Sequence, residues 1–279
     1  MSVRNALSER TKIFAANRAL AHIALAVAAN GAVTRRARVR EEGSLRVRCP
    51  GSGCGELEAV IVNTAGGVAG GDCFNLDVMV APGARLVVTT AAAEKVYRAL
   101  DAAAEIELKL SVGAGGSLAW LPQETILFDR ARLRRSIEIE LDGDAQLVLA
   151  EAVVFGRSGM GELVENGDLI DRWRVRRCGH LILAETLQLD GAVAAKLKQA
   201  AVANGAIAIA TVLVVPGNDD TATRLRSLNG LFHGEVGISA WNGIVVARLC
   251  APSGAALRHD LAALLGAARG APLPRLWVN

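Results

Sequence analysis

The segment EIELKLSV, residues 105–112, alternates strictly between apolar and polar side chains. Successive side chains of a β-strand point to opposite faces, so this pattern predicts a strand with one buried face. The segment SIEIEL, residues 136–141, repeats the alternation, and RWRVRR, residues 172–177, places Trp173 and Val175 on the inner side. Half-buried strands are therefore a recurring element of this chain.

Four further segments are apolar almost throughout and predict strands that are buried on both faces. They are RLVVTT (85–90), QLVLAEAVVF (146–155), LILAETLQL (181–189) and AIAIATVLVV (206–215). Turn-forming residues such as Pro82-Gly83 and Asp142-Gly143-Asp144 separate the segments at roughly even intervals. Many short, regularly separated strands favour an all-β sandwich, barrel or solenoid over alternating β-α units.

Arginine is concentrated in three predicted strands. Residues 33–49 alternate on both sides of the turn-like Glu41-Glu42-Gly43-Ser44, which predicts a hairpin with an arginine-rich exposed face. The stretches 35–40, 130–135 and 172–177 are most simply solvated strand faces. The alternative is that these arginines bind an acidic protein partner.

Helical spacing occurs late in the chain. Leu257, Leu261 and Leu264 share one face of a predicted helix over 254–269, which the following prolines stop. A second helix is predicted near 219–229, and the alanine-rich stretch 192–203 is a further helix candidate. The expected fold is mainly β: a single elongated β-sandwich or β-helix-like domain over residues 1–279, with two helices toward the C-terminus.

Composition excludes several classes of protein. The net charge is +3 and aromatic residues make up 4%, whereas nucleic-acid binders combine strong basic patches with stacking aromatics. The apolar run at 19–29 is shorter than the roughly 20 residues that span a bilayer, and MSVRNALSER (1–10) lacks the order of a signal peptide. The five cysteines contain no C-x-x-C pair, which favours a reduced, cytoplasmic protein without a membrane segment.

The segment VNTAGGVAGGD, residues 62–72, has the glycine content of a phosphate-binding loop. Such a loop normally opens a helix, but the following CFNLDVMV predicts a strand, and Asp72 would repel a phosphate. A tight turn with positive φ angles explains the glycines but leaves Asp72 unexplained.

The sequence contains no recognisable motif for a catalytic nucleophile. The segment FGRSGMGE, residues 155–162, lacks the last glycine of a nucleophile elbow. The histidines stand far apart and in no triad spacing, and a lone histidine is more often a packing or surface residue than a ligand. They are His22, His180, His233 and His259.

Carboxylates that interrupt apolar or small-residue segments are the strongest candidates for function. They are Asp72, Glu94, Glu124, Glu151 and Glu185. A buried carboxylate is costly unless it is paired, hydrogen-bonded or hydrated. Each either pairs with a neighbour such as Lys95 or Arg98, or lines a hydrated interior that handles a divalent cation without holding it tightly.

A family resemblance covers residues 35 to 277. The segments that carry it, in order, are SLRVRCPG, EAVIVNTAGGVAGGD, TTAAAEKVYR, LAWLPQETILFDRARLRRSIEIEL, FGRSGMGE, DRWRVRRCGHLILAE, SAWNGIVVARL and LPRLW. In this order they resemble the urease accessory protein family UreD, also called UreH. Residues 1–30 match less clearly, and Ala91 and Cys73 replace polar residues common in the family.

The resemblance implies a non-enzymatic maturation factor with a mostly β fold. Such proteins work with UreF and the GTPase UreG on apo-urease, to which the complex delivers nickel. On this view nickel is cargo in transit, no cofactor is tightly bound, and the five carboxylates are candidates for its path. The region of Trp277 is a candidate partner contact. A pure scaffold with no metal role, and a nucleotide-binding enzyme that uses the glycines of 66–71, are the alternatives.

Overall fold

The computed structural model describes residues 18–50 and 55–277. The segment MSVRNALSER lies outside them. The strands are β1 (Leu20–Asn30), β2 (Val33–Glu42), β3 (Leu45–Arg48), β4 (Leu57–Asn63), β5 (Cys73–Val80), β6 (Arg85–Thr90), β7 (Glu94–Val96), β8 (Ala104–Val112), β9 (Ser117–Trp120), β10 (Thr125–Leu127), β11 (Arg132–Leu141), β12 (Gln146–Phe155), β13 (Gly167–Arg177), β14 (His180–Gly191), β15 (Ala208–Val215), β16 (Glu235–Trp241) and β17 (Ile244–Ala251). The helices are α2 (Val193–Leu197), α3 (Asp219–Arg226) and α4 (Gly254–Arg269), with short 3-10 turns η1 (Ser158–Met160), η2 (Asn229–Leu231) and η3 (Arg275–Trp277).

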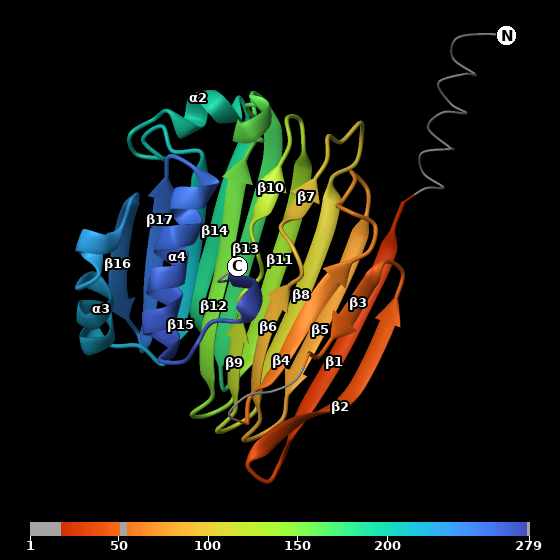
Figure 1. Ribbon diagram of the computed structural model, residues 1–279, viewed down its shortest axis with the longest axis vertical. Helices are drawn as coiled ribbons and strands as arrows, with labels where there is room; N and C mark the ends of the chain where they lie inside the picture. Colours follow the sequence, from red (N-terminus) through yellow and green to blue (C-terminus); the bar gives the residue numbers. More distant parts are fainter. Residues whose placement is uncertain (1–17, 51–54, 278–279) are drawn as a thin grey trace, which may run out of the picture.

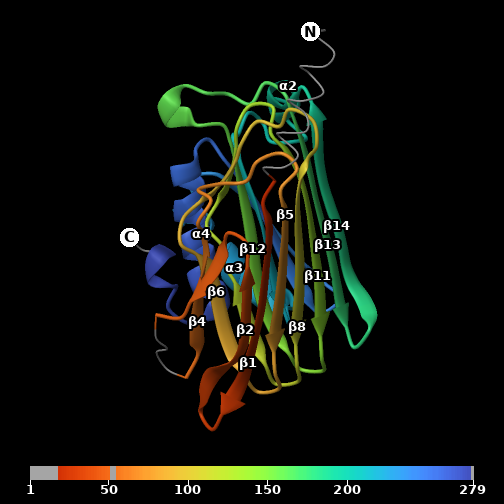
Figure 2. The same cartoon turned by 90° about the vertical axis from the view of Figure 1, so that its right-hand side faces the viewer.

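The strands form two sheets that pack face to face (Figures 1 and 2). The first sheet, sheet A, has seven strands in the order β14-β13-β11-β8-β5-β1-β2. The second, sheet B, runs β16-β17-β15-β12-β9-β6-β4-β3, and the short strands β7 and β10 attach to it through β12. In Figure 2 the two sheets are seen almost edge-on; α4 lies on the side of sheet B that faces away from sheet A, and α2 lies at one end of the sandwich.

The centre of the molecule is built like a β-solenoid. From β4 to β13, apart from the short β7 and β10, the strands alternate between the two sheets, and neighbours within each sheet are parallel, as in β5–β8 and β8–β11 of sheet A and β6–β9 and β9–β12 of sheet B. Antiparallel strands close the two ends, with β2 at one edge and β14 at the other. The predicted mainly β, sandwich or β-helix-like fold with helices toward the C-terminus is confirmed.

The alternating segments place their apolar side chains between the sheets. EIELKLSV forms most of β8, SIEIEL most of β11 and RWRVRR the end of β13. Trp173 and Val175 are buried as predicted, at 2% and 0% exposure. The polar side chains of the same strands face solvent on the outer surface of sheet A. The two-residue alternation in the sequence therefore indicates both the buried and the exposed face of each strand.

A second apolar core lies between sheet B and the helices. The predicted helix 254–269 coincides with α4, and Leu257, Leu261 and Leu264 are fully buried on its inner face. Ser253 caps its N-terminus by accepting the Ala256 N–H at 3.1 Å, a preferred cap residue in its usual role. The predicted helix near 219–229 is α3, and the helix candidate at 192–203 contains the short α2.

Two predictions about strands are wrong. Residues 33–49 are no hairpin: β2 pairs with β1 in sheet A, and β3 pairs with β4 in sheet B, so the turn at Gly43 carries the chain from one sheet to the other. LILAETLQL is not buried on both faces, because β14 is the edge strand of sheet A and its outer side is solvent-exposed. Local patterns predict an extended chain but do not say which strand lies beside it.

Within the described residues, no helix has both the length and the apolar character needed to cross a membrane.

Candidate functional site

Asp72, at the end of the glycine-rich stretch, holds its own loop closed. Its side chain is buried, at 4% exposure. One carboxylate oxygen accepts the N–H of Ala19 at 2.8 Å, and the other accepts the N–H of Ala69 at 2.7 Å. These bonds join the entrance of β1 to the turn before β5. Asp72 therefore has a structural task that explains why the stretch ends on a carboxylate.

The glycines before Asp72 form a tight turn. Gly71 has a φ of 86°, and a Cβ on Gly67 would lie 2.4 Å from the Tyr97 ring, so both positions require glycine. The N–H groups of Val68 and Ala69 are bonded within the chain, to Lys95 and Asp72. The strand β5 follows, with no helix N-terminus to receive a phosphate. The tight-turn interpretation of these glycines is confirmed.

Glu124 ties the C-terminal segment to sheet B. Its carboxylate lies 3.1 Å from a guanidinium nitrogen of Arg258 on α4. Arg258 also donates to the Leu276 carbonyl at 2.8 Å and lies over the ring of Trp277. Trp277 is itself buried and donates its indole N–H to the Leu121 carbonyl at 3.0 Å. Within the C-terminal region that is predicted as a partner contact, the ring of Trp277 is thus buried.

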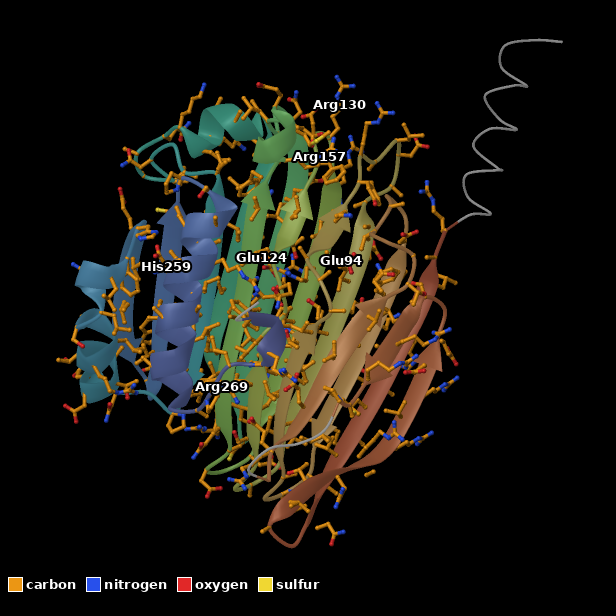
Figure 3. All side chains as sticks on the ribbon, in the orientation of Figure 1. Glu94, Glu124, Arg130, Arg157, His259 and Arg269 are labelled. Atoms are coloured by element: carbon orange, nitrogen blue, oxygen red, sulfur yellow. The ribbon has the colours of Figure 1, made fainter. Side chains whose placement is uncertain are left out.

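Glu94, on β7, is a half-buried carboxylate held by an amide side chain. Its N–H donates to the Glu124 carbonyl at 2.9 Å, which places the two residues together in the middle of the molecule (Figure 3). Its carboxylate accepts from the Asn63 amide at 3.1 and 3.2 Å, and no ion pair among the described residues includes it. Burial raises the pKa of Glu94 from its ordinary 4.5 to about 7, against the smaller opposing effect of Asn63.

Glu151 belongs to a buried charged cluster between the sheets. Arg135 of β11 donates to Glu151 of β12 and, through two nitrogens, to Asp171 of β13. All three side chains are 5–7% exposed. The indole N–H groups of Trp120 and Trp173 complete the cluster, at 2.9 Å from Glu151 and 3.0 Å from Asp171. The carboxylates outnumber the arginine, and burial together with the Asp171 charge raises the pKa of Glu151, although Arg135 opposes this.

The strand register extends this cluster toward solvent. Across sheet B, Glu151 stands beside Thr211 of β15, which stands beside Arg248 of β17. Arg248 reaches across the sandwich to Glu185 of β14, with 2.5 Å between the charged groups. The exposed fraction of the side chains rises from 5% at Glu151 to 25% at Glu185 and 55% at Arg248. One row of adjacent positions therefore leads from the interior to the edge of the sandwich.

A cavity of about 450 Å³ lies along this row. Its acidic lining residues come from both sheets, and Cys250 adds a thiol. The acids are Glu151, Asp171, Glu185 and Glu235. The cavity thus brings together Glu151 and Glu185 of the five predicted carboxylates. Glu94 and Glu124 form a separate pair near β7 and β10, and Asp72 stands apart in its turn.

Comparison with known proteins agrees with this architecture. The family model described as "UreD urease accessory protein" matches residues 19–278. A urease accessory protein UreD of Rhodopseudomonas palustris is 55% identical over 269 residues, which cover 96% of each chain. A urease accessory protein UreD of Bradyrhizobium diazoefficiens is 54% identical over 277 residues, 99% of this chain and 100% of the relative.

The chain belongs to the UreD family.

In this UreD-family chain, the cations that pair with Glu151, Glu185 and Glu124 lie on other strands and on α4, 16, 63 and 134 residues away in the sequence. The sequence predicts pairs with neighbours such as Lys95 or Arg98, but the partners are Arg135, Arg248 and Arg258. Arginines far away in sequence can lie opposite an acid only after the sheets and α4 pack. The cations nearest to the acids in the sequence therefore do not identify their partners.

Arg135 and Asp171 were missed, although the sequence carries a signal for both. Arg135 is two and four residues before the inward-facing Ile137 and Ile139, on the same face of the strand, and Asp171 is two residues before Trp173. A charged residue that alternates in step with the apolar residues of a strand is predicted to face the core with them. The interpretation of 130–135 as a wholly solvated face is wrong at Arg135, which is 5% exposed.

Proposed function

We propose that this protein is a urease maturation factor that acts in the cytoplasm with UreF and UreG on apo-urease. In this role it is a scaffold and also conducts nickel through the cavity between the sheets. Hydrolysis of GTP takes place on UreG, and this chain carries out no catalysis. The observation that carries the conduit is the row of polar side chains from the buried Glu151 to the surface pair Glu185–Arg248.

The chemistry of the row suits an ion in transit. Carboxylate and hydroxyl oxygens with water accommodate a hydrated divalent cation, whereas a dense cysteine and histidine site would retain nickel. Glu151 and Glu185 already share their oxygens with Arg135 and Arg248, which leaves only part of each carboxylate for an ion. Binding at each step is then weak, as passage requires.

The same arginines favour the alternative of a pure scaffold. Ion pairs hold Glu124, Glu151 and Glu185, and two backbone amides hold Asp72, so these carboxylates also have structural partners. Under that alternative the cluster orients the sheets and the surface holds UreF against urease. The two functions differ in whether charge in the cavity matters once the complex has assembled.

The decisive experiment is a double substitution, Glu151→Gln with Glu185→Gln. Glutamine keeps the size and an acceptor oxygen for Trp120, but it removes the charge that attracts a cation. The variant is co-expressed with urease and the other accessory proteins. Nickel per urease active site and recovery of the accessory complex are measured together.

The control is Glu107→Gln with Glu138→Gln, two exposed acids on the outer face of sheet A. A conduit predicts that urease nickel falls in the cavity variant but not in the control, while both complexes assemble. Normal nickel loading in the cavity variant would rule out the conduit. If the accessory complex does not assemble in the cavity variant, the role of these carboxylates is structural.

A further inference from the structure

We propose that His233 and His259 form a surface binding site for one divalent transition-metal ion. The pair lies outside the sandwich: His259 is on α4, in the helix layer (Figure 3), and His233 stands between η2 and β16. Ligand atoms of these histidines and of Asp260 all lie within 4.8 Å of one another. The site shares no residue with the cavity between the sheets, and the proposal does not depend on a role in urease maturation.

Asp260 brings the two histidines together. It is fully buried, and its carboxylate oxygens accept the N–H groups of His233 and Gly234, both at 2.8 Å. These bonds fasten the segment before β16 to α4. As a result the rings of His233 and His259 stack in parallel, with their centroids 4.2 Å apart.

Asp260 also prepares His259 as a ligand. The Nδ1 atom of His259 lies 3.2 Å from an oxygen of Asp260. In the neutral tautomer whose Nδ1–H donates a hydrogen bond to this carboxylate, the free lone pair is on Nε2, the nitrogen farther from the helix. A carboxylate behind a histidine is the usual support of a metal-binding imidazole, since it orients the ring and increases its basicity.

The role of Asp260 in the loop accounts for its own burial but not for two exposed imidazoles on top of it. Both rings are solvent-accessible, and the side chain of His259 is 51% exposed. Pairs of imidazole nitrogens suit ions such as Ni²⁺, Zn²⁺ and Cu²⁺, in contrast to the oxygen ligands that Mg²⁺ and Ca²⁺ prefer. The donor set therefore defines the class of ion.

Binding requires the stacked rings to turn. Lone pairs of parallel imidazoles run side by side, whereas a metal must lie about 2.0–2.1 Å from each nitrogen. The exposed rings are free to tilt about their side-chain bonds, so one ion replaces the stack, with water in the remaining positions. We assign His233 and His259 as ligands and Asp260 as the positioning residue, because its oxygens are already engaged.

Calorimetric titration of the purified full chain with NiSO₄, and separately with ZnSO₄, tests the site. The chain carries an affinity tag that contains no histidine. The variant His233→Gln with His259→Gln is compared with His180→Gln, an exposed histidine at the start of β14. We expect the double variant to bind one ion fewer per chain than the wild type, and His180→Gln to bind the wild-type number. Equal numbers in all three proteins, or an equal loss in His180→Gln, would overturn the proposal.

Pulsed electron paramagnetic resonance with Cu²⁺ as the probe identifies the ligands. Two imidazole nitrogens coupled to the ion are expected in the wild type, and one in each single histidine variant. Asp260→Asn should lower the affinity by about 10- to 100-fold while the two-nitrogen spectrum remains, because it alters support and not ligation. A spectrum without histidine coupling in the wild type would also refute the site. Far-ultraviolet circular dichroism of the histidine variants checks that the fold is retained.

Discussion

The two ends of the cavity between the sheets use the same pair of chemical groups in different surroundings. At the inner end, Arg135 meets Glu151 and Asp171 with almost no exposed surface. At the outer end, Arg248 meets Glu185 where solvent reaches both side chains. Water screens the outer charges and replaces a lost partner, but it does neither at the inner end. Identical ion pairs should therefore differ greatly in what their removal costs.

The strongest test of this comparison removes the inner cation. Arg135→Met leaves Glu151 and Asp171 buried without a counterion, and we expect the free energy of unfolding to fall by about 3–5 kcal/mol. Urea unfolding at pH 8 measures the change. The neighbouring Arg134→Met, at an exposed position of the same strand, is the matched control and should be near neutral.

Adding Glu151→Gln and Asp171→Asn to Arg135→Met removes the uncompensated charge. Most of the lost stability should return, because neutral amides keep acceptors for the indole N–H groups of Trp120 and Trp173. If stability does not return, the loss in Arg135→Met comes from packing and not from charge.

Glu94 sharpens the comparison because it is half-buried, yet no arginine in the described part of the chain pairs with it. Its pKa is raised to about 7, so the folded protein holds a proton that the unfolded chain releases near pH 4.5. Between these values the folded state binds more protons, and its stability falls as pH rises. Above pH 7 the full cost is present. Glu94→Gln should therefore stabilise the protein at pH 8 by about 1–3 kcal/mol and have little effect at pH 4, below both pKa values.

Urea unfolding of wild type and Glu94→Gln at pH 4, 6 and 8 gives the difference curve. Glu107→Gln, an exposed glutamate on β8, is the control. A difference between wild type and Glu94→Gln that stays constant with pH would contradict the raised pKa. It would place the effect in the hydrogen bond from Asn63.

The smallest effect is expected at the outer end of the cavity. Glu185→Gln should change the free energy of unfolding by no more than about 1 kcal/mol, because exposed pairs gain little and are screened by salt. The effect should shrink further in 1 M NaCl. A loss as large as that of Arg135→Met would show that the outer pair is excluded from water, and the contrast between the two ends would disappear.

The difference between the two sheets shows how far local sequence carries the prediction. Sheet A has an outer face in water, so its central strands β8, β11 and β13 alternate cleanly and were predicted with their inner faces. Sheet B is covered by sheet A on one side and by α3 and α4 on part of the other. Its strands β12 and β15 are nearly continuous apolar runs, which predict a strand but say nothing about its neighbours.

By itself the sequence determined the local conformations of this protein. Alternation predicted strands and their buried faces, the leucine spacing of 257–264 predicted α4, and the family segments identified the UreD relationship. Each of these properties depends on residues a few positions apart. Alternate side chains of a strand point to opposite faces, so the order of polar and apolar residues already indicates which face meets water and which meets the core.

Only the tertiary structure decided which groups meet. It pairs β2 with β1 and not with β3, brings Arg135, Arg248 and Arg258 to acids 16, 63 and 134 residues away in the sequence, and stacks His233 on His259 above Asp260. Such contacts depend on strand order and on how the sheets and helices pack, and these are properties of the whole chain. A turn at Gly43 is equally compatible with a hairpin and with a crossing between sheets, and the choice belongs to the global packing of apolar surface.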